Sequence, residues 1–174
     1  LSIYRTSIDG DLILDDLNVR LLAPRKYINI LIENCRVKGS LYGRRWRLRG
    51  RSAKLYNLNI GGSASFEGTQ GGKLMLEELN VERNVDCSNL DVDYLIGTVK
   101  CKKFSLRNAR VKEIDLGGIS CEVLDLREAK IDATKTLGIF NIESYEVSEN
   151  TSLPKELAEN LPGFKEYKKY IKVH

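Results

Sequence analysis

Apolar residues along most of this chain follow a spacing that is neither helical nor simply alternating. In the segment 74–81, apolar side chains occupy the first, third, sixth and eighth positions, as Leu74, Leu76, Leu79 and Val81. An α-helix would place such residues three and four positions apart, and a flat strand would keep strict alternation. The two-three-two spacing instead predicts a five-residue unit whose first and third side chains point into a core. The same pattern recurs in residues 12–19, 30–37, 53–60, 85–92, 104–111 and 124–131.

Apolar residues also recur in columns about every twenty residues, which is the length of four such units. One column reads Val19, Val37, Ile60, Val81, Cys101 and Cys121, and a second reads Leu14, Ile32, Leu55, Leu76, Ile96 and Leu116. Both columns advance by 18, 23, 21, 20 and 20 residues. Shorter columns read Phe66, Cys87, Leu106, Leu126 and Val92, Val111, Ile131. A shared repeat of this length predicts a solenoid in which each turn of chain stacks on the one before it.

The quintets of residues 124–133, LDLRE and AKIDA, resemble those of the pentapeptide-repeat proteins, which usually carry Ala first, Asp or Asn second, and Leu or Phe third. The resemblance covers roughly residues 12–140. It implies an all-β fold, a right-handed single-stranded β-helix of about six to seven four-sided coils, about 20 residues each. The first position is often large here, and one-residue slips occur near Ser63, Asn84 and Asp93. These departures predict an irregular helix, and a wider β-helix stays open as an alternative.

The composition changes near the C-terminus, so we expect a β-helix solenoid over residues 1–146 and a helical cap over 147–174. Ser152 and Pro154 are typical of a helix start, and residues 164–171 can form a second helix after Pro162-Gly163. A stripe at helical spacing would close the end of the core, and it consists of Leu157, Leu161, Phe164, Tyr167 and Ile171. The alternative is that these helices engage a partner or complete a dimer.

Charge is strongly segregated along the chain, although the net charge is only +4. Residues 1–17 carry one basic and four acidic groups, whereas residues 18–54 carry eleven basic groups against one acid. Residues 55–174 carry sixteen basic and nineteen acidic groups. A clustered positive field attracts polyanions or an acidic partner.

The segment 43–51 concentrates this charge, with five arginines and one tryptophan in nine residues. Arginine suits phosphates, and tryptophan can stack on a base. If Trp46 and Leu48 point inward, then Arg45, Arg47 and Arg49 share an outward face. The candidate polyanion- or partner-binding residues are Arg25, Lys26, Arg36, Lys38, Arg44, Arg45, Trp46, Arg47, Arg49, Arg51 and Lys54. The alternative is a solvated basic face that is partly paired to acids elsewhere.

The four cysteines, Cys35, Cys87, Cys101 and Cys121, occupy first or third positions of quintets, where small apolar residues belong. No CxxC pair exists, so their spacing does not indicate a zinc site. Cys101 and Cys121 are predicted to lie one coil apart in the same column, a separation that would allow a disulfide. We expect all four to be buried and reduced, as in a cytoplasmic protein.

Motifs of common enzyme classes are missing: the sequence has no GxSxG, no P-loop and a single histidine at position 174. We therefore expect no catalytic, cofactor-binding or metal-ligating residues, no small-molecule substrate and, without a long apolar run, no membrane span.

The leading hypothesis is a non-catalytic binding or scaffold module for protein–protein interaction or self-association. The alternative is nucleic-acid or polyanion binding through the basic segment. A glycan-processing β-helix, using acids such as Asp91, Asp93, Asp115 and Asp125, is a third, weaker hypothesis.

Overall fold

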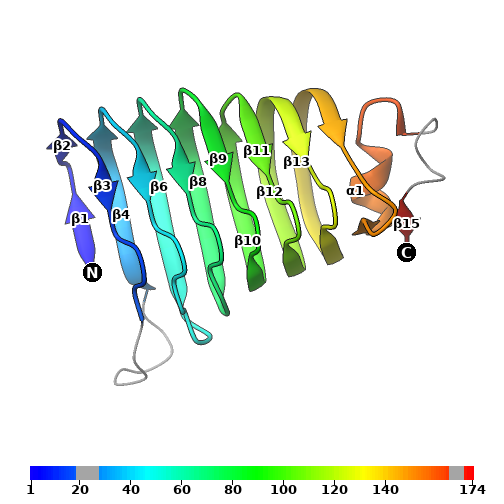
Figure 1. Cartoon of the computed structure of the whole chain (residues 1–174), viewed down its shortest axis with the longest axis horizontal. Helices are drawn as coiled ribbons and strands as arrows, with labels where there is room; N and C mark the ends of the chain where they lie inside the picture. The colour runs from blue at the N-terminus through cyan, green and yellow to red at the C-terminus, as the bar shows by residue number, and fades with distance from the viewer. Residues whose placement is uncertain (19–27, 165–170) are drawn as a thin grey trace.

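The computed structural model describes residues 1–18, 28–164 and 171–174. The chain forms a parallel β-solenoid of about six turns, which confirms the predicted all-β solenoid class (Figure 1). Long strands form one side of the solenoid: β4 (Ile28–Val37), β6 (Ser52–Ile60), β8 (Lys73–Val81), β10 (Asp91–Lys100), β12 (Arg110–Asp125) and β13 (Lys130–Glu146).

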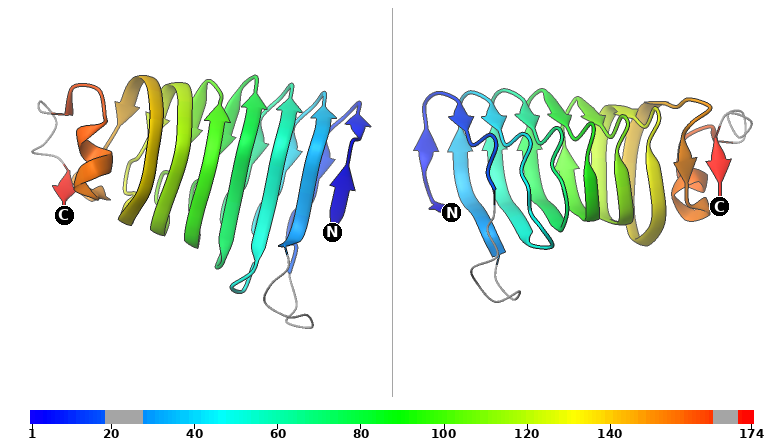
Figure 2. Two further views of the ribbon diagram at one scale, coloured as in Figure 1. Left: turned by 180° about the vertical axis from the view of Figure 1, so that it is seen from behind. Right: turned by 60° about the horizontal axis from the view of Figure 1, so that its bottom comes forward.

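Short strands form the opposite side (Figure 2). They are β3 (Leu12–Ile13), β5 (Leu41–Tyr42), β7 (Ala64–Ser65), β9 (Asn84–Asp86) and β11 (Lys103–Ser105). At the N-terminal end, β1 (Ser2–Tyr4) and β2 (Ser7–Ile8) both pair with β4. All strand pairs are parallel, and β12 joins the two rows because it pairs with both β10 and β11. The core between the rows is therefore a narrow, continuous stack of side chains.

The first predicted column is confirmed from Val37 onward. Val37 pairs in register with Ile60, and Ile60 pairs with Val81. Cys101 and Cys121 continue the column as buried residues. The shorter column Val92, Val111, Ile131 is likewise in register. Val19, the first member predicted, lies outside the described residues.

The second predicted column is wrong at two positions. Gly97, and not Ile96, pairs with both Leu76 and Leu116. The separation of 20 residues that predicted Ile96 holds only beyond Gly97, where the register between β8 and β10 shifts. Ile96 consequently faces outward and is half-buried. At the N-terminus, Ile3 pairs with Ile32, whereas Leu14 donates its amide N–H to Tyr42 O on the short-strand side. The first coil is longer than predicted, since 29 residues separate the paired positions 3 and 32.

Residues with positive φ recur at two fixed places in the coils and mark corners of the chain. One set is Arg5, Asn34, Asn57 and Glu78, and the other is Asp16, Arg45, Gly68, Asn89, Asn108 and Glu128. Asparagine tolerates this left-handed conformation better than most residues do. Its side chains also stack between coils, since Asn57 Nδ2 donates to Asn34 Oδ1 at 2.8 Å and Asn108 Nδ2 donates to Asn89 Oδ1 at 2.8 Å.

The C-terminal end is covered by a mixed segment in which the helical part is small. Ser152–Leu153 forms strand β14, so Ser152 is not the predicted helix cap; Pro154 holds that position. Helix α1 covers only Lys155–Glu159, and strand β15 (Lys172–Val173) pairs with β14. The predicted second helix lies largely outside the described residues. The residues buried against the last coil are Leu153, Leu157, Ala158, Leu161 and Ile171.

Candidate binding surfaces

The acidic first coil lies directly on the basic second coil. Lys38 Nζ lies 2.7 Å from Asp9 Oδ1, and Arg44 donates from both Nε and Nη2 to Asp15 Oδ2 at 3.0 and 2.5 Å. Arg45 instead donates to both carboxylate oxygens of Asp16, from Nε to Oδ1 at 2.7 Å and from Nη2 to Oδ2 at 2.8 Å.

These hydrogen bonds favour the ionised form of both carboxyl groups. The hydrogen bonds from Arg44 lower the pKa of Asp15, and those from Arg45 lower the pKa of Asp16. Part of the positive charge predicted to be available is therefore compensated within the chain.

Trp46 and Arg51 are both buried, which removes them from any exposed patch. Trp46 is 0% exposed, its Nε1–H donates to Leu14 O at 2.6 Å, and its ring lies 5.9 Å from that of Phe66. It is therefore not available to stack on a nucleobase. Arg51 is only 3% exposed. Trp46 and Leu48 both point inward, which is the condition under which Arg45, Arg47 and Arg49 were expected to face outward, and these three arginines are exposed.

The remaining candidates do not form one face. Arg36 and Lys38 lie at the end of β4, whereas exposed Arg47 and Arg49 lie between β5 and β6. Lys54 is half-buried and pairs with Glu77 at 2.7 Å. Arg25 and Lys26 lie outside the described residues. A polyanion site over the whole segment 18–54 therefore stays a prediction, with its described members divided between separate surfaces.

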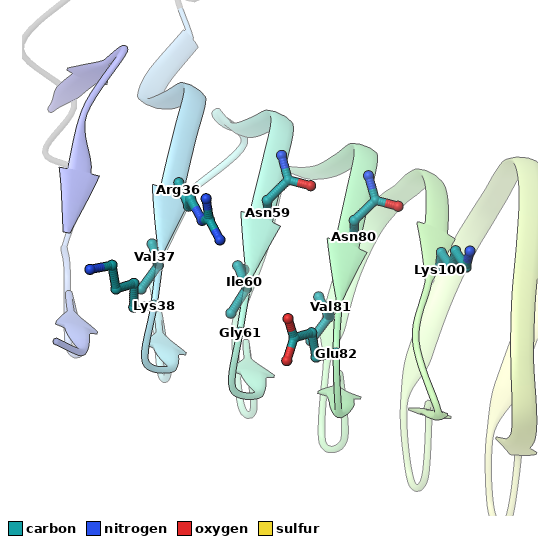
Figure 3. Close-up of a pocket in the computed structure, with 10 residues that line it drawn as sticks. All are labelled: Arg36, Val37, Lys38, Asn59, Ile60, Gly61, Asn80, Val81, Glu82 and Lys100. Carbon is teal, nitrogen blue, oxygen red and sulfur yellow. The ribbon is translucent and has the colours of Figure 1, made fainter. Parts of the chain in front are cut away.

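A polar groove crosses the C-terminal ends of the long strands (Figure 3). Its central part, a depression of about 640 Å³, is lined by Arg36, Lys38, Asn59, Asn80, Glu82 and Lys100, together with Val37, Ile60, Gly61 and Val81. Arg36 and Lys100 make no ion pair with the residues that the structure describes. Sequence reasoning missed Asn59, Asn80 and Lys100, because their alignment depends on the coil register.

An outward-facing row of three apolar residues and one lysine lies on the other side of the corner formed by Asn34, Asn57 and Glu78. Leu31, Lys54, Met75 and Ile96 are aligned on β4, β6, β8 and β10. Beside them, Lys54 Nζ lies 5.2 Å from the ring centroid of Tyr56, and Lys73 Nζ lies 4.4 Å from that of Tyr94. We call this surface the outer stripe, and its half-buried members are Leu31, Lys54, Tyr56, Met75, Tyr94 and Ile96.

The acids considered for catalysis do not converge on one point. Asp93 pairs with Lys112 at 2.6 Å, and Asp115 lies 3.7 Å from Lys135. Asp125 belongs to a different cluster, with Arg127 at 2.7 Å and Lys103 at 3.2 Å.

No group of histidine, cysteine and acidic side chains suited to a metal ion occurs among residues 1–18, 28–164 and 171–174. In the same ranges, no helix is long and apolar enough to cross a membrane.

All four cysteines are free and buried, as predicted. Burial raises the pKa of Cys87 well above its usual value, that of Cys101 to about 12 and that of Cys121 to about 11. Raised thiol pKa values leave little reactive thiolate at neutral pH. These residues are core side chains.

No protein-family model matches this chain, and neither a curated protein nor a solved structure matches it.

Proposed function

We propose that this protein is a non-catalytic assembly module that associates side by side with a second copy through the outer stripe. The observation that carries the proposal is the alignment of Leu31, Met75 and Ile96 at outward positions of three long strands. Outward positions of a solenoid strand normally carry polar residues. Methionine and tyrosine are among the side chains enriched at protein interfaces.

A second copy fits this surface for a geometric reason. The outward side chains repeat at the spacing of paired strands, about 4.8 Å, and an identical face has the same spacing. Two such faces can interdigitate as stacked sheets do. The stripe and its border also carry both signs of charge, including Lys54, Lys73, Glu77 and Glu113, so a copy in the opposite direction can pair unlike charges.

We further propose that the coils are degenerate pentapeptide repeats. Support comes from residues 104–131, where buried residues occur in pairs two positions apart, and each pair begins five residues after the previous one. The pairs are Phe104/Leu106, Ala109/Val111, Ile114/Leu116, Ile119/Cys121, Leu124/Leu126 and Ala129/Ile131. Ion pairing of Asp93, Asp115 and Asp125 supports the non-catalytic part of the proposal.

The experiment is sedimentation equilibrium across a concentration series up to about 1 mM, at which even weak self-association is detected. We expect the wild type to form dimers and Met75→Glu/Ile96→Glu to stay monomeric. Ile13→Glu is the matched control, because Ile13 is 64% exposed and lies outside the outer stripe. A monomeric wild type over the whole series, or equal loss of dimers in the control, would refute the proposal.

A further inference from the structure

The polar groove follows one column of residues along the whole solenoid. Register aligns Ser7 with Arg36, Arg36 with Asn59, and Asn59 with Asn80. The column then continues through Lys100, Ser120 and Asn141. Apart from half-buried Ser120, all of these residues are exposed. Seven successive strands of the described chain thus present one polar side chain each, at the same point of the turn.

The surface is hollowed along this column. The central depression of Figure 3 is bordered on the N-terminal side by a second one, lined by residues that include Arg5, Ser7, Arg36 and Asn59. On the C-terminal side a third depression includes Asn80, Lys100, Ser120 and Asn141. Each neighbour shares column residues with the central depression, so the three form one groove. With six inter-strand steps of about 4.8 Å, the column is about 29 Å long. A groove of this shape suits an extended, linear ligand.

Amides and hydroxyls line the groove along its column, its C-terminal part also includes Leu79, Val99 and Ile119, and its charge is moderately positive. Among its lining residues the cations are Arg5, Arg36, Lys38 and Lys100, and the acids are Glu78 and Glu82. Arg36 and Lys100 lie three coils apart, which is about 14 Å between their strands. The amides of Asn59 and Asn80 lie between these two cations and extend in the same direction (Figure 3). Amides can donate to and accept from sugar hydroxyls, whereas Arg and Lys bind carboxylates or sulfates.

We propose that this groove binds an extended acidic oligosaccharide, with its hydroxyls on the asparagines and its carboxylates or sulfates on Arg36 and Lys100. A pyranose residue is about as long as one inter-strand step, so successive sugars can meet successive coils. Single-stranded nucleic acid fits less well, because its binding sites stack bases on aromatic rings and the lining residues include none.

The test measures fluorescence anisotropy of labelled hexasaccharides in low and high salt. A heparin hexasaccharide carries sulfates and a galacturonate hexasaccharide carries only carboxylates, so the two identify which acid the groove takes. Maltohexaose serves as the neutral sugar, and a labelled single-stranded oligonucleotide as the competing polymer. We expect at least one acidic hexasaccharide to bind with micromolar affinity that weakens with salt, and the neutral sugar to bind at least 10-fold more weakly.

Variants separate a built groove from general attraction between opposite charges. Arg36→Ser/Lys100→Ser should weaken binding at least 10-fold. Arg47→Ser/Arg49→Ser removes the same charge elsewhere and should change binding less than 2-fold. Asn59→Ala/Asn80→Ala leaves the charge unaltered and should still weaken binding several-fold. Circular dichroism confirms that each variant is folded.

Several results would overturn the inference. These are no binding of either acidic hexasaccharide at low salt, equal losses in the two charge variants, unchanged binding by the asparagine variant, and tighter binding of the oligonucleotide. The outer stripe lies across a corner from the groove, so Met75→Glu/Ile96→Glu should leave glycan binding unchanged. The groove proposal and the assembly proposal therefore succeed or fail separately.

Discussion

Asp125 lies almost fully buried between two cations, Arg127 from its own coil and Lys103 from the coil before. Glu146 of the next coil completes the cluster, 3.0 Å from Arg127 and 3.3 Å from Lys103. Burial opposes ionisation of Asp125, but the hydrogen bonds from Arg127 and Lys103 outweigh it and lower its pKa from 3.8 to about 2. Residues on three successive coils thus keep Asp125 ionised, so these ion pairs contribute to the stability of the stacked coils.

Because the folded-state pKa of Asp125 is lowered, its ionised form stabilises the fold above pH 3.8, and this contribution is lost as the pH falls toward 2. We expect Asp125→Asn to lower the free energy of unfolding at pH 7 and to differ less from the wild type as the pH falls through this range. Denaturant unfolding at several pH values measures the effect. Asp132→Asn, at an exposed carboxylate, should show little difference at any pH. A constant gap between Asp125→Asn and the wild type from pH 7 to pH 2 would contradict this interpretation.

At the scale of elements, β12 and β13 bring two glycines together, Gly117 and Gly138. Gly138 lies next to Gly117 in the register, and a Cβ atom at Gly138 would overlap the Gly117 carbonyl oxygen. The clash is with backbone, so no side chain can move to relieve it. Glycine at Gly138 therefore lets the two long strands keep their pairing at this point.

We therefore expect Gly138→Ala to lower the free energy of unfolding by more than about 2 kcal/mol, since β12 or β13 must shift to accommodate it. Gly10→Ala is the matched control, because no atom lies within 4 Å of a Cβ added there. The control should be neutral or stabilising by up to about 1 kcal/mol, as the unfolded chain loses freedom. Equal effects of both substitutions in urea unfolding would show that the Gly138 contact is not tight.

The elements were predictable wherever the five-residue unit is unbroken. Residues 104–131 follow the predicted inward pattern, whereas Trp46, predicted as a candidate binding residue, lies buried in the core. Ile96 was misplaced because the unit from Gly97 to Cys101 advances by four residues instead of five. Apolar spacing alone does not show where this shorter step lies, so counting back in fives from Cys101 gives Ile96 in place of Gly97. The ion pairs of Asp15 and Asp16 were also missed, because they depend on a 29-residue first coil. The outer stripe and the polar groove could not be predicted for the same reason. Their residues lie side by side only because of the pairing register between strands, which the sequence pattern does not specify.

At the scale of the whole molecule, each coil contacts mainly its neighbours, so stability is close to a sum over adjacent pairs. The C-terminal end of the stack is covered by α1, which contacts β13 and buries Leu157 at 2% exposure. Losing this cover should destabilise the last coils first and leave distant coils folded.

We expect Leu157→Ala to cost about 2–5 kcal/mol in that region, as a buried leucine deletion does. Hydrogen exchange should then accelerate most in residues 130–146 and least in residues 52–60. Glu156→Ala, on the exposed side of the same helix, should leave both segments as protected as in the wild type. Uniform acceleration along the chain would mean that the solenoid unfolds as one unit.

The repeat length also has a kinetic consequence. Paired residues such as Val92 and Val111, or Leu55 and Leu76, are 19 and 21 positions apart, and this separation does not grow with the number of coils. Adding coils would therefore reduce the relative contact order, the quantity that slows folding in most all-β proteins. Duplicating one coil would therefore lengthen the chain without increasing the sequence separation between any strand and the strand with which it pairs.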